Sequence, residues 1–213
     1  MEKSPVDPAL VLAWQTAHSI ARGSPAPVHD RGGFRVDTNS EKEATRWVFP
    51  HLCDGLREIA RSVSAPRHFL KLCGTGGELK SAVPATWEIQ PAGYFMRAGA
   101  TRLVASALPE GYALERCQTG PVTQVRIIAS DGSVAACGSS AETVDAFVYD
   151  RIETSPDHRR KGLGATVMTA LAAARKYDAV PQLLVATEEG HALYTRLGWE
   201  VLWPFATATV PAG

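Results

Sequence analysis

The chain has 213 residues, of which 45% are hydrophobic and 21% charged, a composition typical of a soluble globular protein that buries a core. Its 22 basic and 22 acidic side chains cancel, so there is no net positive charge to attract nucleic acid or an anionic membrane surface. Because there is neither a long apolar run nor an N-terminal secretion signal, we expect a cytoplasmic protein that binds neither nucleic acid nor membrane.

In the first half, apolar residues at helical spacing predict a helix over residues 7–22, which Gly23 ends. Ser40, with Glu43 three residues later, has the pattern of a capping box and predicts a helix that runs to about Ser62. The other expected elements are strands at Phe34–Asp37, His68–Cys73, Trp87–Gln90 and Tyr94–Arg97, and a short helix near Glu78–Val83. The pattern weakens over residues 98–112, which divides the chain into domains 1–100 and 101–213.

The second half is patterned more clearly. Asp131-Gly132 separates two apolar runs and predicts a hairpin of strands 122–129 and 133–138. A strand over Asp145–Thr154, a helix over 162–177, a strand over 182–187, a helix over 190–197 and a strand near 203–210 follow. An antiparallel meander followed by a strand–helix–strand crossover predicts an α/β fold, with a mixed, mostly antiparallel sheet flanked by helices.

The four cysteines are widely spaced, with no C-x-x-C pair and no histidine at zinc-ligand spacing. We therefore expect reduced, mostly buried thiols and no metal site.

The most informative segment is 154–165, between the predicted strand 145–154 and the predicted helix 162–177. Gly162 and Gly164 stand at the start of that helix, where backbone N–H groups have no intrahelical partner and the helix dipole is positive. Glycine lets an anion approach this backbone closely, and Arg159, Arg160 and Lys161 add positive charge. The segment therefore suits a pyrophosphate.

Two common pyrophosphate loops do not fit this segment. A Walker loop requires Gly-Lys followed by Ser or Thr, which is absent here. A dinucleotide fingerprint requires a small residue where Val167 stands.

Arg159-Arg160-Lys161-Gly162-Leu163-Gly164 resembles the Gln/Arg-x-x-Gly-x-Gly/Ala motif of the GCN5-related N-acetyltransferase (GNAT) superfamily, at the usual strand-to-helix junction. Ala192-Leu193-Tyr194-Thr195-Arg196-Leu197-Gly198-Trp199 is similar to that family's closing Leu-Tyr-x-x-Leu-Gly-aromatic motif. The resemblance covers about residues 118–205 and implies a GNAT-like fold, with acetyl-CoA as the co-substrate.

The resemblance also implies roles for individual residues. Tyr194 is expected to protonate the departing thiolate, and Thr187 stands where the family often has an asparagine that binds the pantetheine amide. The cofactor-binding residues that it implies are Ile152, Glu153 and Thr154 for the pantetheine arm and thioester, and Arg159, Arg160, Lys161, Gly162, Leu163, Gly164 and Ala165 for the pyrophosphate.

The catalytic base is the least determined role. Strand alternation places Glu153 on one face with Asp145, Tyr149 and Arg151, and Asp150 on the other face. Glu153 is the first choice and Asp150 the second, and the alternative is that arginines neutralise both. For Tyr194 the alternative is a core aromatic residue.

The first half resembles a degenerate copy of the second, with Trp87-Glu88-Ile89 matching Trp199-Glu200-Val201. The copy lacks the glycine loop and the tyrosine, so we expect it to supply packing and one wall of the acceptor pocket.

Two functions remain open from the sequence. The first is an N-acetyltransferase that moves an acetyl or short acyl group from CoA to a primary amine by direct attack, with a small-molecule acceptor. The second is a non-catalytic CoA-binding sensor or scaffold. The sequence identifies no acceptor, and a homodimer is compatible with it.

Overall fold

One mixed sheet crosses both halves of the chain in the computed structural model, which describes residues 6–100 and 107–211. Its strand order is β1-β2-β3-β4-β12-β6-β11-β10-β9-β8-β7, and β5 pairs with β12. The first half contains α1 (Pro8–Ala21), β1 (Val28–Asp30), β2 (Gly33–Asp37), β3 (Thr45–Phe49), α2 (Asp54–Ser62), β4 (His68–Leu72), α3 (Gly76–Ala82), β5 (Glu88–Ile89) and β6 (Gly93–Ala98).

The second half contains β7 (Tyr112–Thr119), β8 (Val122–Ala129), β9 (Val134–Glu142), β10 (Phe147–Thr154), the 3-10 turn η1 (Pro156–His158), α4 (Leu163–Ala172), β11 (Gln182–Thr187), α5 (Glu188–Arg196) and β12 (Trp199–Thr209). The predicted α/β class and the mostly antiparallel sheet with flanking helices are confirmed.

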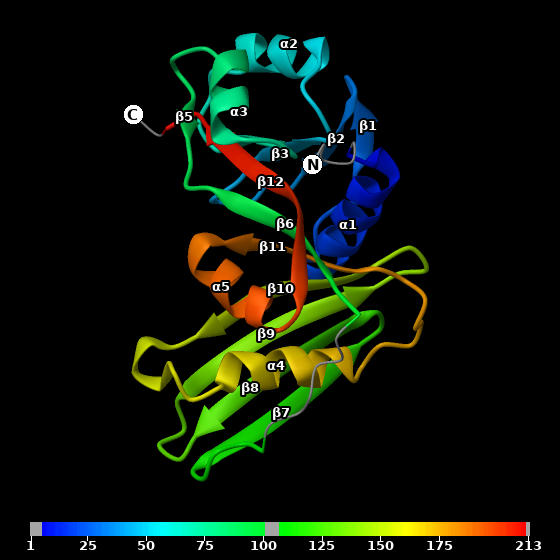
Figure 1. Cartoon of the computed structure of the whole chain (residues 1–213). Helices are drawn as coiled ribbons and strands as arrows, with labels where there is room; N and C mark the ends of the chain where they lie inside the picture. The colour runs from blue at the N-terminus through cyan, green and yellow to red at the C-terminus, as the bar shows by residue number, and fades with distance from the viewer. Residues whose placement is uncertain (1–5, 101–106, 212–213) are drawn as a thin grey trace.

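The two halves exchange strands. Strand β6 from the first half lies between β11 and β12, where it is antiparallel to both. The end of β12 extends into the first half and pairs with β4 and β5. Figure 1 shows β6 and β12 side by side across the middle of the molecule. The sequence boundary at residue 100 therefore does not divide the sheet.

Both halves repeat one order of elements. Strand β3 leads through α2 to the parallel strand β4 and then to α3, while β10 leads through α4 to the parallel strand β11 and then to α5. This order is the one expected from the proposed repeat. A common origin of the halves stays a prediction.

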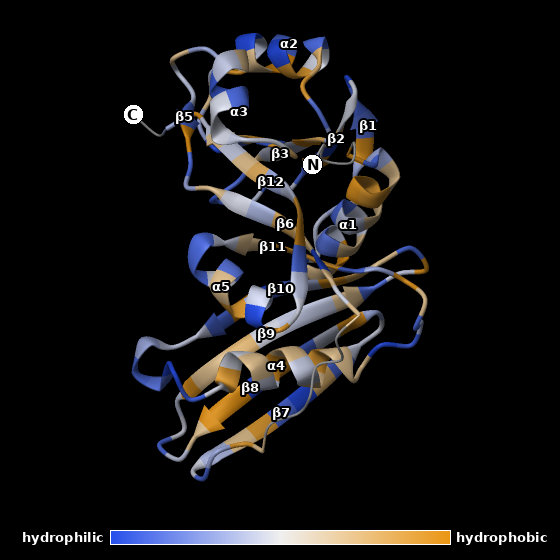
Figure 2. Cartoon of the chain, viewed as in Figure 1, coloured by the Kyte–Doolittle hydropathy of each residue, from blue (hydrophilic) through white to orange (hydrophobic). Residues whose placement is uncertain are grey.

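Helices α1 and α4 pack their apolar faces against the sheet. Helix α1 begins at Asp7, whose carboxylate accepts from Ala9 N at 2.9 Å, and buries Val11, Trp14 and Ala17 against one face of the sheet. Helix α4 buries Leu163, Val167, Met168 and Leu171 in a separate core. Figure 2 shows α4 as mostly hydrophobic, whereas the outer turns of α2 are hydrophilic.

The predicted helix from Ser40 to Ser62 is wrong in its first half. Ser40 and Glu43 close a local turn, in which Glu43 N donates to Ser40 Oγ at 3.0 Å. Strand β3 follows with all five residues buried between β2 and β4, and α2 starts only at Asp54. A fully buried strand lacks the alternation that would have distinguished it from a helix.

Strand β7 was not predicted at all. It is one of the two edge strands of the sheet, and seven of its eight residues are exposed, so no apolar period marks it. It carries Cys117, which is exposed, while Cys53 and Cys137 are partly exposed and Cys73 is buried. The four thiols are free, but the expectation that most of them are buried is wrong.

Candidate active site

The site is built where two parallel strands separate. Strands β10 and β11 pair only at Phe147 with Gln182 and at Val148 with Leu183. From Tyr149 onward β10 pairs only with β9 among the described strands, so its other edge faces an opening. That edge presents backbone groups to any chain lying between the strands.

A bulge in β10 sets the side-chain directions at this opening. The register with β9 shifts between Asp150 and Glu153, and Arg151 has a positive φ of 53°. Ile152 consequently points into the core beneath α4, where a Cβ on Gly138 would lie 2.5 Å from its Cδ1.

The alternation predicted for this strand is therefore wrong beyond Asp150. Glu153 lies opposite Cys137, on the face away from α4, and so shares a face with Asp150. The side chain of Ile152 is partly buried against this core, so its backbone is the part that we expect to contact a ligand.

The glycine loop opens α4 as predicted. Arg160 and Gly162 adopt positive φ angles of 65° and 77°, and no side chain caps the helix. Its first backbone hydrogen bond runs from Thr166 N to Gly162 O, so the N–H groups of 163–165 precede it. A Cβ on Gly164 would lie 3.2 Å from Leu193 Cδ2, which shows how closely α5 approaches. An uncapped, positively polarised helix start of this kind fits the phosphates of CoA.

The three basic residues of the loop differ in their contacts. Lys161 Nζ donates to Tyr112 Oη at 2.8 Å, and that hydroxyl lies 2.9 Å from His158 Nδ1. Arg159 Nε donates to Thr154 O at 3.4 Å, and its guanidinium lies 4.0 Å from Glu189. Arg160 is exposed and makes no hydrogen bond or ion pair within the described part of the chain. Sequence reasoning missed Tyr112 because β7 was not recognised.

Tyr194 is 7% exposed in α5, and its ring centroid lies 6.0 Å from that of Trp199. Its hydroxyl has no hydrogen-bond partner among residues 6–100 and 107–211. Burial, and then the negative charge of Asp150, raise the pKa of Tyr194 to about 12. The phenol therefore keeps its proton at neutral pH.

Asp150 is held by α1. Arg22 donates to both carboxylate oxygens, at 2.7 and 2.9 Å, and His18 Nε2 lies 3.7 Å away. Burial alone would raise the pKa of Asp150, but the hydrogen bonds from Arg22 and the positive charges of Arg22 and Arg151 hold it below its ordinary value. A carboxylate so stabilised is a weak base, which agrees with the alternative that arginines neutralise it.

Glu153, in contrast, is exposed and makes no ion pair with the described residues. Thr187 is the N-cap of α5, where its Oγ1 accepts from Gly190 N at 3.2 Å. That hydroxyl still has its own proton to donate.

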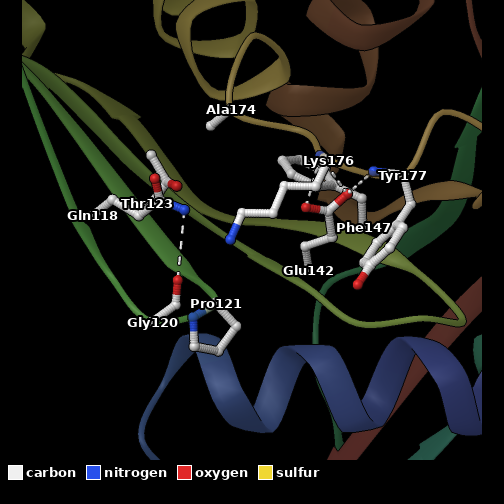
Figure 3. A pocket seen from close by; sticks show the side chains of 9 residues that line it. All are labelled: Gln118, Gly120, Pro121, Thr123, Glu142, Phe147, Ala174, Lys176 and Tyr177. Carbon is white, nitrogen blue, oxygen red and sulfur yellow. Dashed lines mark hydrogen bonds between the residues drawn. The ribbon is translucent and has the colours of Figure 1, made fainter.

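A hollow of about 160 Å³ at the other end of α4 is unrelated to this opening. In Figure 3 the Glu142 carboxylate points at the chain leaving α4 and accepts from Lys176 N and Tyr177 N at 2.9 Å. The contact secures the loop from α4 towards β11.

Residues 122–201 match the family model described as an acetyltransferase (GNAT) domain. The match contains the strand opening, the glycine loop and Tyr194. This segment is a GNAT domain. The match to the GNAT family model supports acyltransferase activity and implies that the domain binds acyl-CoA.

Solved structures share the fold over more of the chain. The chain is similar to a GCN5-related N-acetyltransferase from Kribbella flavida, with 15% identity, a TM-score of 0.67, and 99% of this chain and 98% of that one covered. A GCN5-related N-acetyltransferase from Sphaerobacter thermophilus is 11% identical, with a TM-score of 0.56 over 99% and 95% of the two chains. A tandem GNAT protein from the clavulanic acid biosynthesis pathway is 17% identical, with a TM-score of 0.53 over 74% and 68%.

A search of curated protein sequences gave no significant match. No described helix is long and apolar enough to cross a membrane.

The first half should bind no CoA of its own. Its counterpart of α4 is α2, but a Cβ on Gly55 in the first turn of α2 would lie 1.9 Å from Arg31 O. The turn between β1 and β2 thus covers the start of α2. We expect calorimetry to give one CoA per chain, and none in Gly164→Glu. A second tight site would contradict this division of the two halves.

Proposed function

We propose that this GNAT domain transfers an acetyl or other short acyl group from CoA to a primary amine of a small molecule, by direct attack of the amine on the thioester. The observations that carry the proposal are the separation of β10 from β11 and the Tyr194 hydroxyl, which stays protonated and has no hydrogen-bond partner among the described residues. Acetyl-CoA, when bound, supplies the thioester.

The residues of the chain have separable tasks in this scheme. The start of α4 binds the pyrophosphate, and the free edge of β10 hydrogen-bonds the pantetheine arm with its backbone. Backbone N–H groups at the bulge donate to the thioester carbonyl oxygen, where negative charge grows during attack. The new C–N bond replaces the C–S bond.

Two protons move in this reaction. The amine nitrogen loses one, and Glu153 is the candidate acceptor because it is an exposed carboxylate at the end of β10 with no described ion-pair partner. The departing sulfur gains one, and Tyr194 is the donor because its raised pKa keeps it protonated.

The test is free-thiol release from acetyl-CoA with a panel of small primary amines, alongside calorimetric binding of CoA. We expect both CoA binding and amine-dependent thiol release. Binding without thiol release for any amine would instead favour the non-catalytic sensor.

A further inference from the structure

A second hollow of about 150 Å³ lies on the side of the strand opening that faces α1. Both separating strands line it, through Tyr149 and Asp150 of β10 and Val185 of β11. The first half closes it with Arg46 of β3 and Lys71 of β4. A cavity of roughly 150 Å³ can hold a group as large as benzene. We call it the Lys71 cavity.

Most charges around the Lys71 cavity are neutralised within the protein. Arg22 pairs with Asp150, and Arg46 Nε donates to the carboxylate of Glu43. Arg46 Nη1 also contacts His18 Nδ1 at 2.9 Å. Burial holds the pKa of His18 well below its ordinary value, so this ring is neutral. Two ion pairs and a neutral imidazole leave the wall without net charge, apart from Lys71.

Lys71 is the exception. Its ammonium makes no hydrogen bond or ion pair with any described residue, and it lies 5.8 and 6.0 Å from the ring centroids of Phe69 and Phe205. Burial, and then the charge of Arg46, lower the pKa of Lys71 to about 8. The side chain is therefore still mostly cationic at neutral pH, although no described carboxylate lies within ion-pair distance of it.

A second group in the wall also lacks a partner. Trp14 lines the cavity and is 3% exposed, and its Nε1 is a buried donor with no acceptor in the described structure. Buried donors without acceptors are rare and costly. The unpaired cation in this wall is complementary to an anion, whereas the Trp14 N–H is fully buried and is not itself exposed to the cavity.

We propose that the Lys71 cavity binds an anionic group of the acceptor, a carboxylate or a phosphate, and that Lys71 is its counter-ion. This assignment rests on the proposed function and makes the acceptor a small amine that carries a negative charge. The anionic group lies beneath α1, and the amine reaches the opening between β10 and β11 past Asp150 and Val185. Lys71 is thus a specificity-determining residue for the acceptor.

The test compares amines with and without an anionic group, with rates referred to the unprotonated amine because the paired amines also differ in basicity: glycine with glycinamide, β-alanine with β-alaninamide, and aminoethyl phosphate with ethanolamine. We expect kcat/KM for the best anionic amine to exceed that of its neutral partner at least about tenfold, because one charged hydrogen bond distinguishes them. Whether carboxylates or the phosphate react better identifies the anion.

In Lys71→Met this preference should disappear, and in Lys71→Arg part of it should return. Lys80→Met removes an exposed lysine of α3 and should leave the preference unchanged. The affinity for acetyl-CoA should be the same in all variants. A neutral partner that reacts as well as its acid, or a preference that survives in Lys71→Met, would overturn the proposal.

Direct binding separates this proposal from the proposed function. The same amines are titrated by calorimetry into the protein saturated with CoA. If no amine releases thiol but an anionic amine binds wild type and not Lys71→Met, the transfer proposal fails and the anion site stands. If none of the anionic amines binds or reacts, the anion site is refuted.

Discussion

Replacing Tyr194 with phenylalanine is expected to lower kcat about a hundredfold while the affinity for acetyl-CoA stays unchanged, because general acid catalysis is worth roughly 10²–10⁴-fold and water can partly substitute. The hydroxyl has no described hydrogen-bond partner, so its removal leaves no described group unsatisfied. The ring and its packing against Trp199 remain. The thermal midpoint should therefore stay within a few degrees of wild type.

Tyr149 offers a matched control. It is buried in the same core, but its hydroxyl donates to Gln182 Oε1 at 2.6 Å. Tyr149→Phe should lose about 1 kcal/mol of unfolding free energy, the typical worth of one hydrogen bond, and keep most of its kcat. If Tyr194 were only a core aromatic, its phenylalanine variant would turn over normally and only Tyr194→Ala would suffer. Wild-type kcat in Tyr194→Phe, with chemistry rate-limiting, would remove Tyr194 from the mechanism.

The elements around the site were predictable because their signals are local. Strand β11 was expected over residues 182–187, which are its observed bounds, since an apolar run there is bounded by Pro181 and a polar stretch. The glycine loop was found from Gly162 and Gly164, whose lack of side chains is itself the signal.

The side-chain directions in β10 were not predictable. They depend on a bulge at Arg151, a non-glycine residue with a positive φ, and nothing in its identity marks that conformation. One extra residue in the strand reverses every later side chain, which moved Glu153 onto the face of Asp150.

The Lys71 cavity could not be predicted for a different reason. Arg22 and Asp150 are 128 positions apart in the sequence. Lys71 lies near them only because β12 joins the strands of the first half to those of the second half in one sheet. Pairings between distant segments follow from topology and leave no periodic pattern. The unpaired ammonium therefore became visible only once its neighbours were placed.

A substitution in the glycine loop is expected to have the largest effect on the affinity for CoA. Gly164→Glu is expected to abolish CoA binding, because the new carboxylate would stand at the start of α4, where the pyrophosphate is proposed to bind. A Cβ at this position requires Leu193 to shift by only a few tenths of an ångström. An acidic residue in the first turn is also favourable for the helix. The variant should therefore fold, with helical circular dichroism like that of wild type.

Two further variants separate charge from bulk and from general effects on α4. Gly164→Ala adds the Cβ alone and should weaken CoA binding far less than the glutamate does. Ala173→Glu adds the same charge at the exposed C-cap of α4, away from the loop, and should bind CoA like wild type. Calorimetry on the three variants compares their affinities for CoA directly. A Gly164→Glu protein that binds CoA as tightly as Ala173→Glu would show that the pyrophosphate lies elsewhere, because no anion could share that helix start with a carboxylate at no cost.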